Sequence, residues 1–207
     1  MPEIVTIARQ FGAGGHTLGA ICADRLGYSL IDEEMVNAVA DKAKVSPEWV
    51  QSVEKDRGDW LLNFFSKLVT PSFLDRLLDD ENRGHINENI YVDHLREIME
   101  ELAREGKAVI VGRGGQYILQ GHPRVLHVLL ISDLEHRIKF LCEHYNMTEQ
   151  KAELTVHRAD KRRANFYKKL GKKNFDDPKL YHVVLNLSKI QLKQAEDIVC
   201  ELAGYGC

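Results

Sequence analysis

The feature that most constrains the fold is a glycine-rich stretch that directly follows a short apolar run near the N-terminus. Residues 3–8 read EIVTIA and are predicted to form a β-strand, because they are rich in β-branched side chains. Residues 9–17, RQFGAGGHT, hold three glycines in four positions, and residues 17–26 then carry apolar side chains at helical spacing, up to a stop at Gly27. In such a strand–loop–helix unit, backbone amides can close around a phosphate. An ordinary tight turn needs fewer glycines, so the stretch predicts a phosphate-binding loop.

The rest of the chain alternates apolar runs with amphipathic segments. Further strands are predicted at 28–31, 108–111, 125–131 and 183–186. The last three are continuously apolar, as strands covered on both faces require. Helices are predicted near 33–44, 47–56, 86–105, 133–145, 148–168 and 189–203. Five strands separated by helices predict an α/β fold with a parallel sheet and helices on both faces.

Two of the predicted helices are preceded by residues at capping-box spacing. Ser132 stands three residues before Glu135, and Ser188 stands three residues before Gln191. In a capping box the two side chains satisfy each other's backbone amides. We therefore expect both serines to be N-cap residues.

Polar residues follow the predicted strands, at the edge of a parallel sheet where ligands bind. Arg113 lies between two glycines after the third strand, and its guanidinium could bind a phosphate through two hydrogen bonds or form a structural ion pair. Asp32 follows the second strand, where it could contact a ligand or cap the next helix. Taken alone, capping is the simpler interpretation of Asp32.

The charge of the chain is unevenly distributed. The formal net charge is only −3, which argues against a protein that coats nucleic acid. Residues 157–173, HRADKRRANFYKKLGKK, nevertheless carry eight basic side chains and one acid, a local charge of +7, so the other 190 residues carry −10. This basic segment is either a solvated helix face or a cluster of cations that meets an anionic ligand.

The sequence has no apolar run near the ~20 residues that a membrane span needs, and no signal peptide is visible. Its cysteines, Cys22, Cys142, Cys200 and Cys207, are far apart and form no CxxC pair, which disfavours a disulfide scaffold or a zinc module. A reducing, cytoplasmic setting is therefore expected. The apolar helical faces within 60–78 suit core packing or a homodimer contact.

Several segments together resemble the bacterial cytidylate kinase-like family, a branch of the P-loop nucleoside monophosphate kinases. The matching segments are residues 7–15, residues 109–114, the late Asp160…Arg163…Phe166-Tyr167, and Asp177…Tyr181-His182-Val183-Val184-Leu185-Asn186. The resemblance covers nearly the whole chain and is weakest at about 46–88. It implies a three-layer P-loop NTPase fold in a single domain, 1–207, with a five-stranded parallel sheet. Its core would be residues 1–32, 90–156 and 176–207, with a helical acceptor-binding insertion at about 33–89 and a basic lid at about 157–175.

The resemblance also implies roles for individual residues. The phosphates of ATP would lie on Gly12, Ala13, Gly14, Gly15, His16 and Thr17, with Thr17 near Mg²⁺. The acceptor would be bound by Asp32, Arg113, Asp160 and Arg163. Arg158 and Arg163 would supply cations for the transfer, Arg158 being the weaker match.

Three departures from the family's kinases stand out. When the loop is aligned on Gly12 and Gly14, Gly15 stands at the P-loop lysine position, and Arg9 stands where the first glycine of the motif would be. Gly114 replaces the aspartate that follows the GR pair in cytidylate kinases, and their SGxxYR segment is not evident after the second strand. Arg9 is our candidate for the lysine's role, and His16 is the second.

These observations favour an ATP-dependent kinase that acts on a nucleoside monophosphate or a similar small phosphorylated acceptor. The missing lysine leaves a second hypothesis open, a nucleotide-binding sensor or scaffold without efficient turnover. A third hypothesis, an RNA-binding module that uses residues 157–173, is disfavoured because the rest of the chain is acidic and no RRM-like or KH-like motif is present.

Overall fold

The computed structural model describes residues 1–32 and 88–204, with only the backbone for 88–95 and for Lys169. The chain divides into two compact units, one formed by residues 1–32 and 99–207 and the other by residues 33–98. The predicted helices at 33–44 and 47–56, most of the expected insertion and the apolar faces within 60–78 lie outside the described residues. The functional division of the chain into core, insertion and lid therefore stays a prediction.

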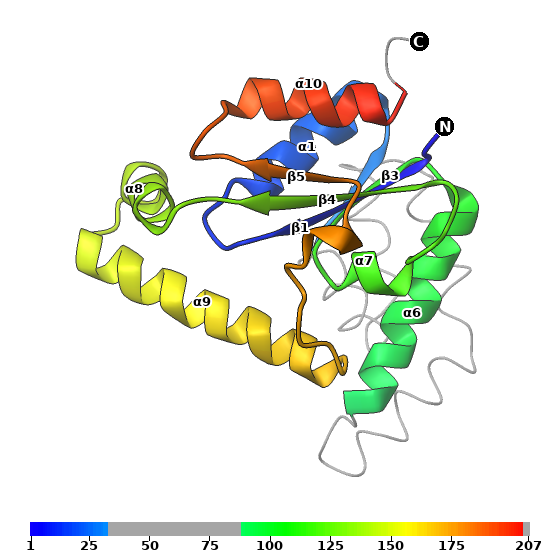
Figure 1. The fold of residues 1–207 in the computed structure, drawn as a ribbon, viewed down its shortest axis with the longest axis horizontal. Coiled ribbons are helices and arrows are strands. Elements are labelled where there is room, and N and C mark those ends of the chain that lie inside the picture. Colours follow the sequence, from blue (N-terminus) through cyan, green and yellow to red (C-terminus); the bar gives the residue numbers. More distant parts are fainter. Residues whose placement is uncertain (33–87, 205–207) are drawn as a thin grey trace, which may run out of the picture. The chain divides into compact units, whose positions relative to one another are not determined.

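A five-stranded parallel sheet forms the centre of the first unit (Figure 1). Its strands are β1 (Ile4–Arg9), β2 (Ser29–Ile31), β3 (Ala108–Val111), β4 (Val125–Ile131) and β5 (Val183–Asn186). They lie in the order β2-β3-β1-β4-β5, and every neighbouring pair is parallel. The central strand β1 places Ile4 opposite Ala108 on one side and Val125 on the other. The prediction of five strands in a parallel sheet is confirmed.

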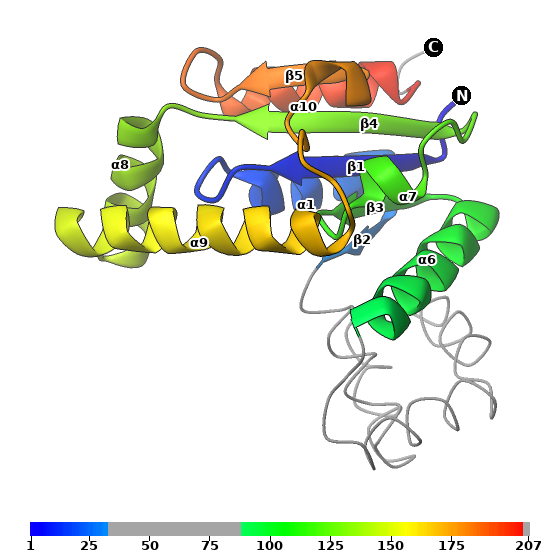
Figure 2. The ribbon, with the colours of Figure 1, turned by 60° about the horizontal axis from the view of Figure 1, so that its bottom comes forward.

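Helices cover both faces of this sheet (Figures 1 and 2). The described helices are α1 (Gly15–Leu26), α6 (Glu88–Glu105), α7 (Gly115–Ile118), α8 (Leu134–Tyr145), α9 (Glu149–Lys169) and α10 (Leu192–Leu202). Helices α1 and α10 pack on one face and α7 packs on the other, which confirms the three-layer α/β class. Helices α8 and α9 pair with each other around a small core of Leu141, Ala152 and Val156.

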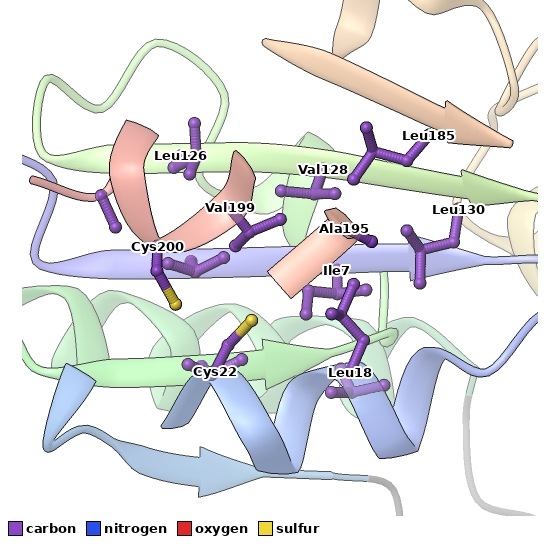
Figure 3. Close-up of a cluster of buried hydrophobic side chains, with 14 of the residues drawn as sticks. Ile7, Leu18, Cys22, Leu126, Val128, Leu130, Leu185, Ala195, Val199 and Cys200 are labelled. Atoms are coloured by element: carbon purple, nitrogen blue, oxygen red, sulfur yellow. The ribbon is translucent and has the colours of Figure 1, made fainter. Parts of the chain in front are cut away.

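The main core lies between the sheet and the pair α1 and α10 (Figure 3). Ile7, Val128 and Leu130 of the central strands are fully buried there. Cys22 of α1 and Cys200 of α10 are also fully buried, and their sulfur atoms face each other. Both are free thiols, and burial raises the pKa of the Cys22 thiol. The cysteines therefore behave as small apolar core residues.

The prediction that Ser132 and Ser188 cap helices is wrong. Helix α8 begins after Asp133, and α10 begins after Gln191, which forms a capping box with Gln194. The two serines instead connect the ends of β4 and β5, since their hydroxyl groups lie 2.9 Å apart and the amide of Asp133 donates to Ser188 Oγ at 2.7 Å. A hydroxyl that joins two strand ends is not available to cap a helix.

A histidine pair, buried His127 and exposed His182, joins β4 to its neighbours. His127 is 4% exposed, and its Nδ1 lies 2.7 Å from Thr6 Oγ1. Its backbone amide donates to Nδ1 of His182 at 2.9 Å, and the two rings stack at 5.3 Å. Burial, followed by repulsion from His182, lowers the pKa of His127 to about 4. The folded protein therefore holds His127 neutral at pH 7.

This pair predicts an acid-sensitive contribution to stability. An unfolded histidine takes up a proton near pH 6.5, whereas folded His127 resists protonation down to pH 4, so folding loses stability as the pH falls through this window. Between pH 7 and pH 4.5 the loss should be about 2–3 kcal/mol. We expect urea unfolding to show this loss in wild type and a smaller loss in His127→Gln. The exposed His157→Gln variant is the matched control, and a wild-type pH dependence that His127→Gln fully retains would exclude His127 as the source.

Candidate phosphate-binding site

The glycine-rich stretch forms a loop between β1 and α1, at the carboxyl edge of the sheet. Gly12 and Gly14 both have left-handed backbones, with φ of +80° and +75°. Gly14 is the N-cap of α1, and it has no side chain to occupy the amides of the first helical turn. The loop is braced by a hydrogen bond from the amide of Ala13 to the carbonyl of Gln10, at 3.2 Å. The geometry therefore offers backbone amides and a positive helix end to an anion.

The loop opens into a cavity of about 560 Å³. Gly12, Ala13, Gly14 and Thr17 line one end of the cavity, while Gly15 is buried and His16 is exposed beside them. The remaining wall is formed by His136, Phe140 and His144 of α8 and by residues 187–192 at the β5–α10 connection, which include the polar Ser188, Lys189 and Gln191. A cavity of this size, lined by a glycine-rich loop and by aromatic side chains, suits a ligand that has both a phosphate group and an aromatic ring.

Thr17 is exposed and lines the cavity. Among the residues that the structure describes, no three His, Cys, Asp or Glu side chains are grouped closely enough to hold a metal ion. At phosphate sites Mg²⁺ keeps several water molecules and takes its other ligands from phosphates and a few protein oxygens. Thr17 fits that pattern, because its hydroxyl lies in the first turn of α1 beside the loop.

Asp32 is joined to the loop. Its Oδ2 lies 3.1 Å from Nε2 of His16, and the Asp32 side chain is 8% exposed, whereas that of His16 is 67% exposed. The carboxylate therefore connects the end of β2 with the start of α1. The sequence left open whether Asp32 meets a ligand or caps a helix, and this pairing with His16 was not predicted.

Arg113 lies in an unusual backbone segment. Gly112, Arg113 and Gly114 all have positive φ, of +86°, +55° and +73°. A left-handed conformation costs a non-glycine residue about 1 kcal/mol or more, and such strain is concentrated at functional sites. The amide of Gly112 donates to the carbonyl of Ile7 at 2.9 Å, which fixes the segment at the end of β1.

Arg137, which the sequence analysis did not single out, connects the loop to α9. Its Nη1 donates to both carboxylate oxygens of Asp160, at 3.0 and 2.9 Å, and to the carbonyl of Phe11 at 3.3 Å. The Arg137 side chain is 8% exposed and that of Asp160 is 37% exposed. Asp160 is therefore linked to the loop indirectly, because Arg137 binds both Asp160 and the carbonyl of Phe11. An arginine six residues beyond the end of a buried strand is a weak signal, since surface helices commonly carry one.

This bridge predicts a measurable coupling. We expect Arg137→Met to lower the free energy of unfolding by about 1–2 kcal/mol, less than for a fully buried pair because Asp160 can hydrate when its partner is removed. In a double-mutant cycle with Asp160→Asn, a coupling of similar size should appear in urea unfolding. Lys139→Met, on the exposed face of the same helix, should change stability by less than about 0.5 kcal/mol. Additive effects of the two substitutions would contradict the bridge.

Arg163 is engaged elsewhere in the described structure. It binds Asp176 through both terminal nitrogens, one at 2.8 Å, and its side chain is 14% exposed. Its guanidinium lies 4.8 Å from the ring centroid of Phe175 and 5.4 Å from that of Tyr167. These contacts hold the turn after α9 against the helix, so the structure does not group Arg163 with the loop.

The basic segment is mostly a solvated helix face. Its side chains at Arg158, Lys161, Arg162, Lys168, Lys172 and Lys173 are exposed. Residues 157–169 belong to the continuous helix α9, which is paired with α8. Of the residues predicted from the late motif, only Asp160 is connected to the loop.

Comparison with known proteins finds a matching family and similar solved structures. The sequence profile of the cytidylate kinase-like family matches residues 4–189. An uncharacterized protein from Eubacterium ventriosum has a similar crystal structure, with a TM-score of 0.68, 20% identity and 97% of each chain covered. An unliganded sugar kinase from Janibacter sp. is similar over 100% of this chain and 96% of its own, with a TM-score of 0.51 and 15% identity. At these identities the structural likeness shows the fold alone. A search of curated proteins finds no relative.

None of the helices in the described part of the chain is long and apolar enough to cross a membrane.

Proposed function

Because the chain belongs to the cytidylate kinase-like family, we propose that it is an ATP-dependent phosphotransferase whose acceptor is a nucleoside monophosphate or a similar small phosphorylated compound. One observation carries this proposal. The loop with left-handed Gly12 and Gly14 joins the central strand to a helix N-terminus and opens into the 560 Å³ cavity. The glycine-rich loop and the aromatic side chains that line the cavity match the two halves of a nucleotide.

The donor nucleotide would place its phosphates on residues 12–17 and its base toward Phe140. The Thr17 hydroxyl would help to hold Mg²⁺, which neutralises charge on the phosphates when it is bound. The protein's contribution is chiefly positioning and electrostatics, because phosphoryl transfer asks little covalent chemistry of side chains. The loop between β1 and α1 would supply that positioning.

The acceptor would lie beyond the ends of β2 and β3, where Asp32 and Arg113 are located. Asp160 would act through Arg137, with which it is paired. Arg158 and Arg163 stay predicted cations for the transfer. A role for Arg163 requires that its pair with Asp176 opens when the substrates bind. The homodimer through residues 60–78 and the cytoplasmic setting also stay predictions.

The role of Arg113 gives a specific prediction. Hydrogen bonds to a charged phosphate contribute about 1.5–3 kcal/mol, so Arg113→Ala should raise the acceptor KM roughly 10- to 100-fold with a smaller change in kcat. Steady-state kinetics with varied acceptor at saturating ATP would measure this effect. Arg162→Ala, an exposed arginine on α9, is the control. An unchanged acceptor KM in Arg113→Ala would refute the assignment.

The proposal is tested by coupled ADP release with ATP and Mg²⁺. The acceptors are CMP, dCMP, UMP, AMP, GMP and a set of small phosphorylated metabolites. Acceptor-dependent turnover supports the kinase. ATP binding in a thermal-shift assay, with no transfer to any acceptor, favours the nucleotide-binding sensor that the missing lysine suggests. Salt-sensitive RNA binding without ATP binding would favour the RNA-binding alternative.

A further inference from the structure

Arg9, the last residue of β1, lies across two glycines that are far apart in the sequence. A Cβ atom added to Gly15 would be 2.6 Å from Cγ of Arg9, 2.9 Å from its Cβ and 3.2 Å from its Cδ. A Cβ atom added to Gly112 would be 2.0 Å from its Nη1 and 2.9 Å from its Cζ. Contacts shorter than 3.0 Å do not occur between real atoms of this kind. The aliphatic stem of Arg9 therefore passes over Gly15, and its guanidinium lies over Gly112.

This contact matters because Gly15 stands at the lysine position of the P-loop motif. In a P-loop of the form GxxxxGK, the first glycine stands where this chain has Arg9, and the lysine stands where it has Gly15. Any side chain at position 15 would leave the backbone toward the space that the stem of Arg9 fills. A lysine at position 15 and an arginine at position 9 therefore exclude each other.

We propose that the cation and the glycine at the two ends of the motif have exchanged positions. Arg9 supplies from strand β1 the positive charge that the P-loop lysine supplies from the helix. This inference rests on the proposed function and names the cation that meets the β- and γ-phosphates of ATP. The exchange accounts for two glycines at once. Gly15 leaves room for the stem, and Gly112 leaves room for the guanidinium.

The surroundings of Arg9 suit this role. Its stem is packed against the start of α1, so little rotamer freedom remains to be lost on binding. Its guanidinium lies over Gly112, which directly follows β3, and Arg113 is the residue after Gly112. A guanidinium stays charged at any physiological pH and can bind two phosphate oxygens through its planar fork. We expect Arg9 to meet the phosphates of the donor and Arg113 the phosphate of the acceptor.

The test measures nucleotide binding, so it needs no knowledge of the acceptor. Full-length wild type and variants are titrated calorimetrically with Mg·ATP and with Mg·ADP. Arg9→Met keeps the stem that packs on Gly15 and removes the charge. We expect it to weaken ATP binding 10- to 100-fold and ADP binding less, which reduces the preference for ATP. Arg9→Lys, which keeps both stem and charge, should stay within tenfold of wild type, and Arg162→Met should match wild type.

The exchange itself is tested by restoring the usual motif. Arg9→Gly alone and Gly15→Lys alone should both weaken ATP binding, the first by loss of the cation and the second by collision with the stem of Arg9. The double variant Arg9→Gly/Gly15→Lys should bind ATP at least tenfold more tightly than Arg9→Gly. Thermal unfolding establishes that each variant is folded.

The outcomes separate this inference from the proposed function. Wild type that binds neither nucleotide overturns both. Wild type that prefers ATP, with an equal preference in folded Arg9→Met, overturns the role of Arg9 and leaves the kinase proposal standing. A folded double variant that binds ATP no better than Arg9→Gly also overturns the exchange.

Discussion

The Gly12→Ala variant should bind ATP about 100-fold more weakly than wild type, although the substitution adds a single methyl group. Gly12 has a φ of +80°, which costs a residue with a side chain about 1–2 kcal/mol. The new Cβ would also lie 3.2 Å from Cβ of Arg137 and 3.3 Å from its carbonyl oxygen. The loop would have to move away from α8, and its amides would no longer converge on one phosphate. Two lost charge-assisted hydrogen bonds account for an effect of this size.

Gly121→Ala provides the matched control for this prediction. Gly121 has a φ of +77°, so alanine experiences the same backbone strain there, but no atom lies within 4 Å of the added Cβ. We expect Gly121→Ala to lower the melting temperature slightly and to leave the affinity for ATP unchanged. Titration calorimetry with Mg·ATP measures the affinity, and urea unfolding measures the stability. Equal affinities in the two variants would show that the conformation of Gly12 does not shape the site.

The Leu18→Ala variant should lower the free energy of unfolding by about 2–5 kcal/mol. Leu18 is fully buried in the core between the sheet and α1 (Figure 3), and removing a buried leucine side chain leaves a cavity that rigid neighbours do not fill. Its backbone amide also makes the first hydrogen bond of α1, to the carbonyl of Gly14 at 2.9 Å. The first turn of α1 therefore belongs to the core through the Leu18 side chain and to the phosphate loop through the carbonyl of Gly14. Each kcal/mol should appear as about 2–4 °C in the melting temperature.

Leu154→Ala is the corresponding control in an exposed position. The Leu154 side chain is 57% exposed on α9, so the same substitution there removes little buried surface. Alanine also has a high helix propensity, and the change in stability should stay within about 0.5 kcal/mol. A Leu18→Ala variant as stable as Leu154→Ala would contradict the packing of α1 against the sheet.

The sheet could be predicted from the sequence because its inner strands β1, β3 and β4 are almost fully buried, and because the edge strand β5 is apolar although partly exposed. The apolar runs at Ala108–Val111, Val125–Ile131 and Val183–Asn186 have the same bounds in the structure. The strand order could not be derived from periodicity, because it depends on which strands pair across long separations. The errors at Ser132 and Ser188 arose because a hydroxyl suitable for a cap can equally bond to another loop, and spacing alone does not distinguish the two.

The phosphate loop could be predicted because the glycines of a turn are a local property. The remainder of the site depends on tertiary pairing. Nothing near Arg163 indicates that Asp176 will bind it across a turn, and nothing near Arg137 points to Asp160 or to the carbonyl of Phe11. The contact of Arg9 with Gly112 joins residues about a hundred positions apart, so composition and spacing cannot show it. The contact of Arg9 with Gly112 joins the ends of neighbouring parallel strands, whereas the other two depend on how α9 packs against α8 and the following turn.

The central place of β1 has a consequence for the newly made chain. Strand β1 is synthesised first, yet both of its partners, β3 and β4, begin more than a hundred residues later, at Ala108 and Val125. At a translation rate of about 5–20 residues per second, β1 waits roughly 5–20 s before either partner has been made. Its apolar side chains have no sheet to enter during this interval. The sheet therefore cannot form around its central strand until late in synthesis.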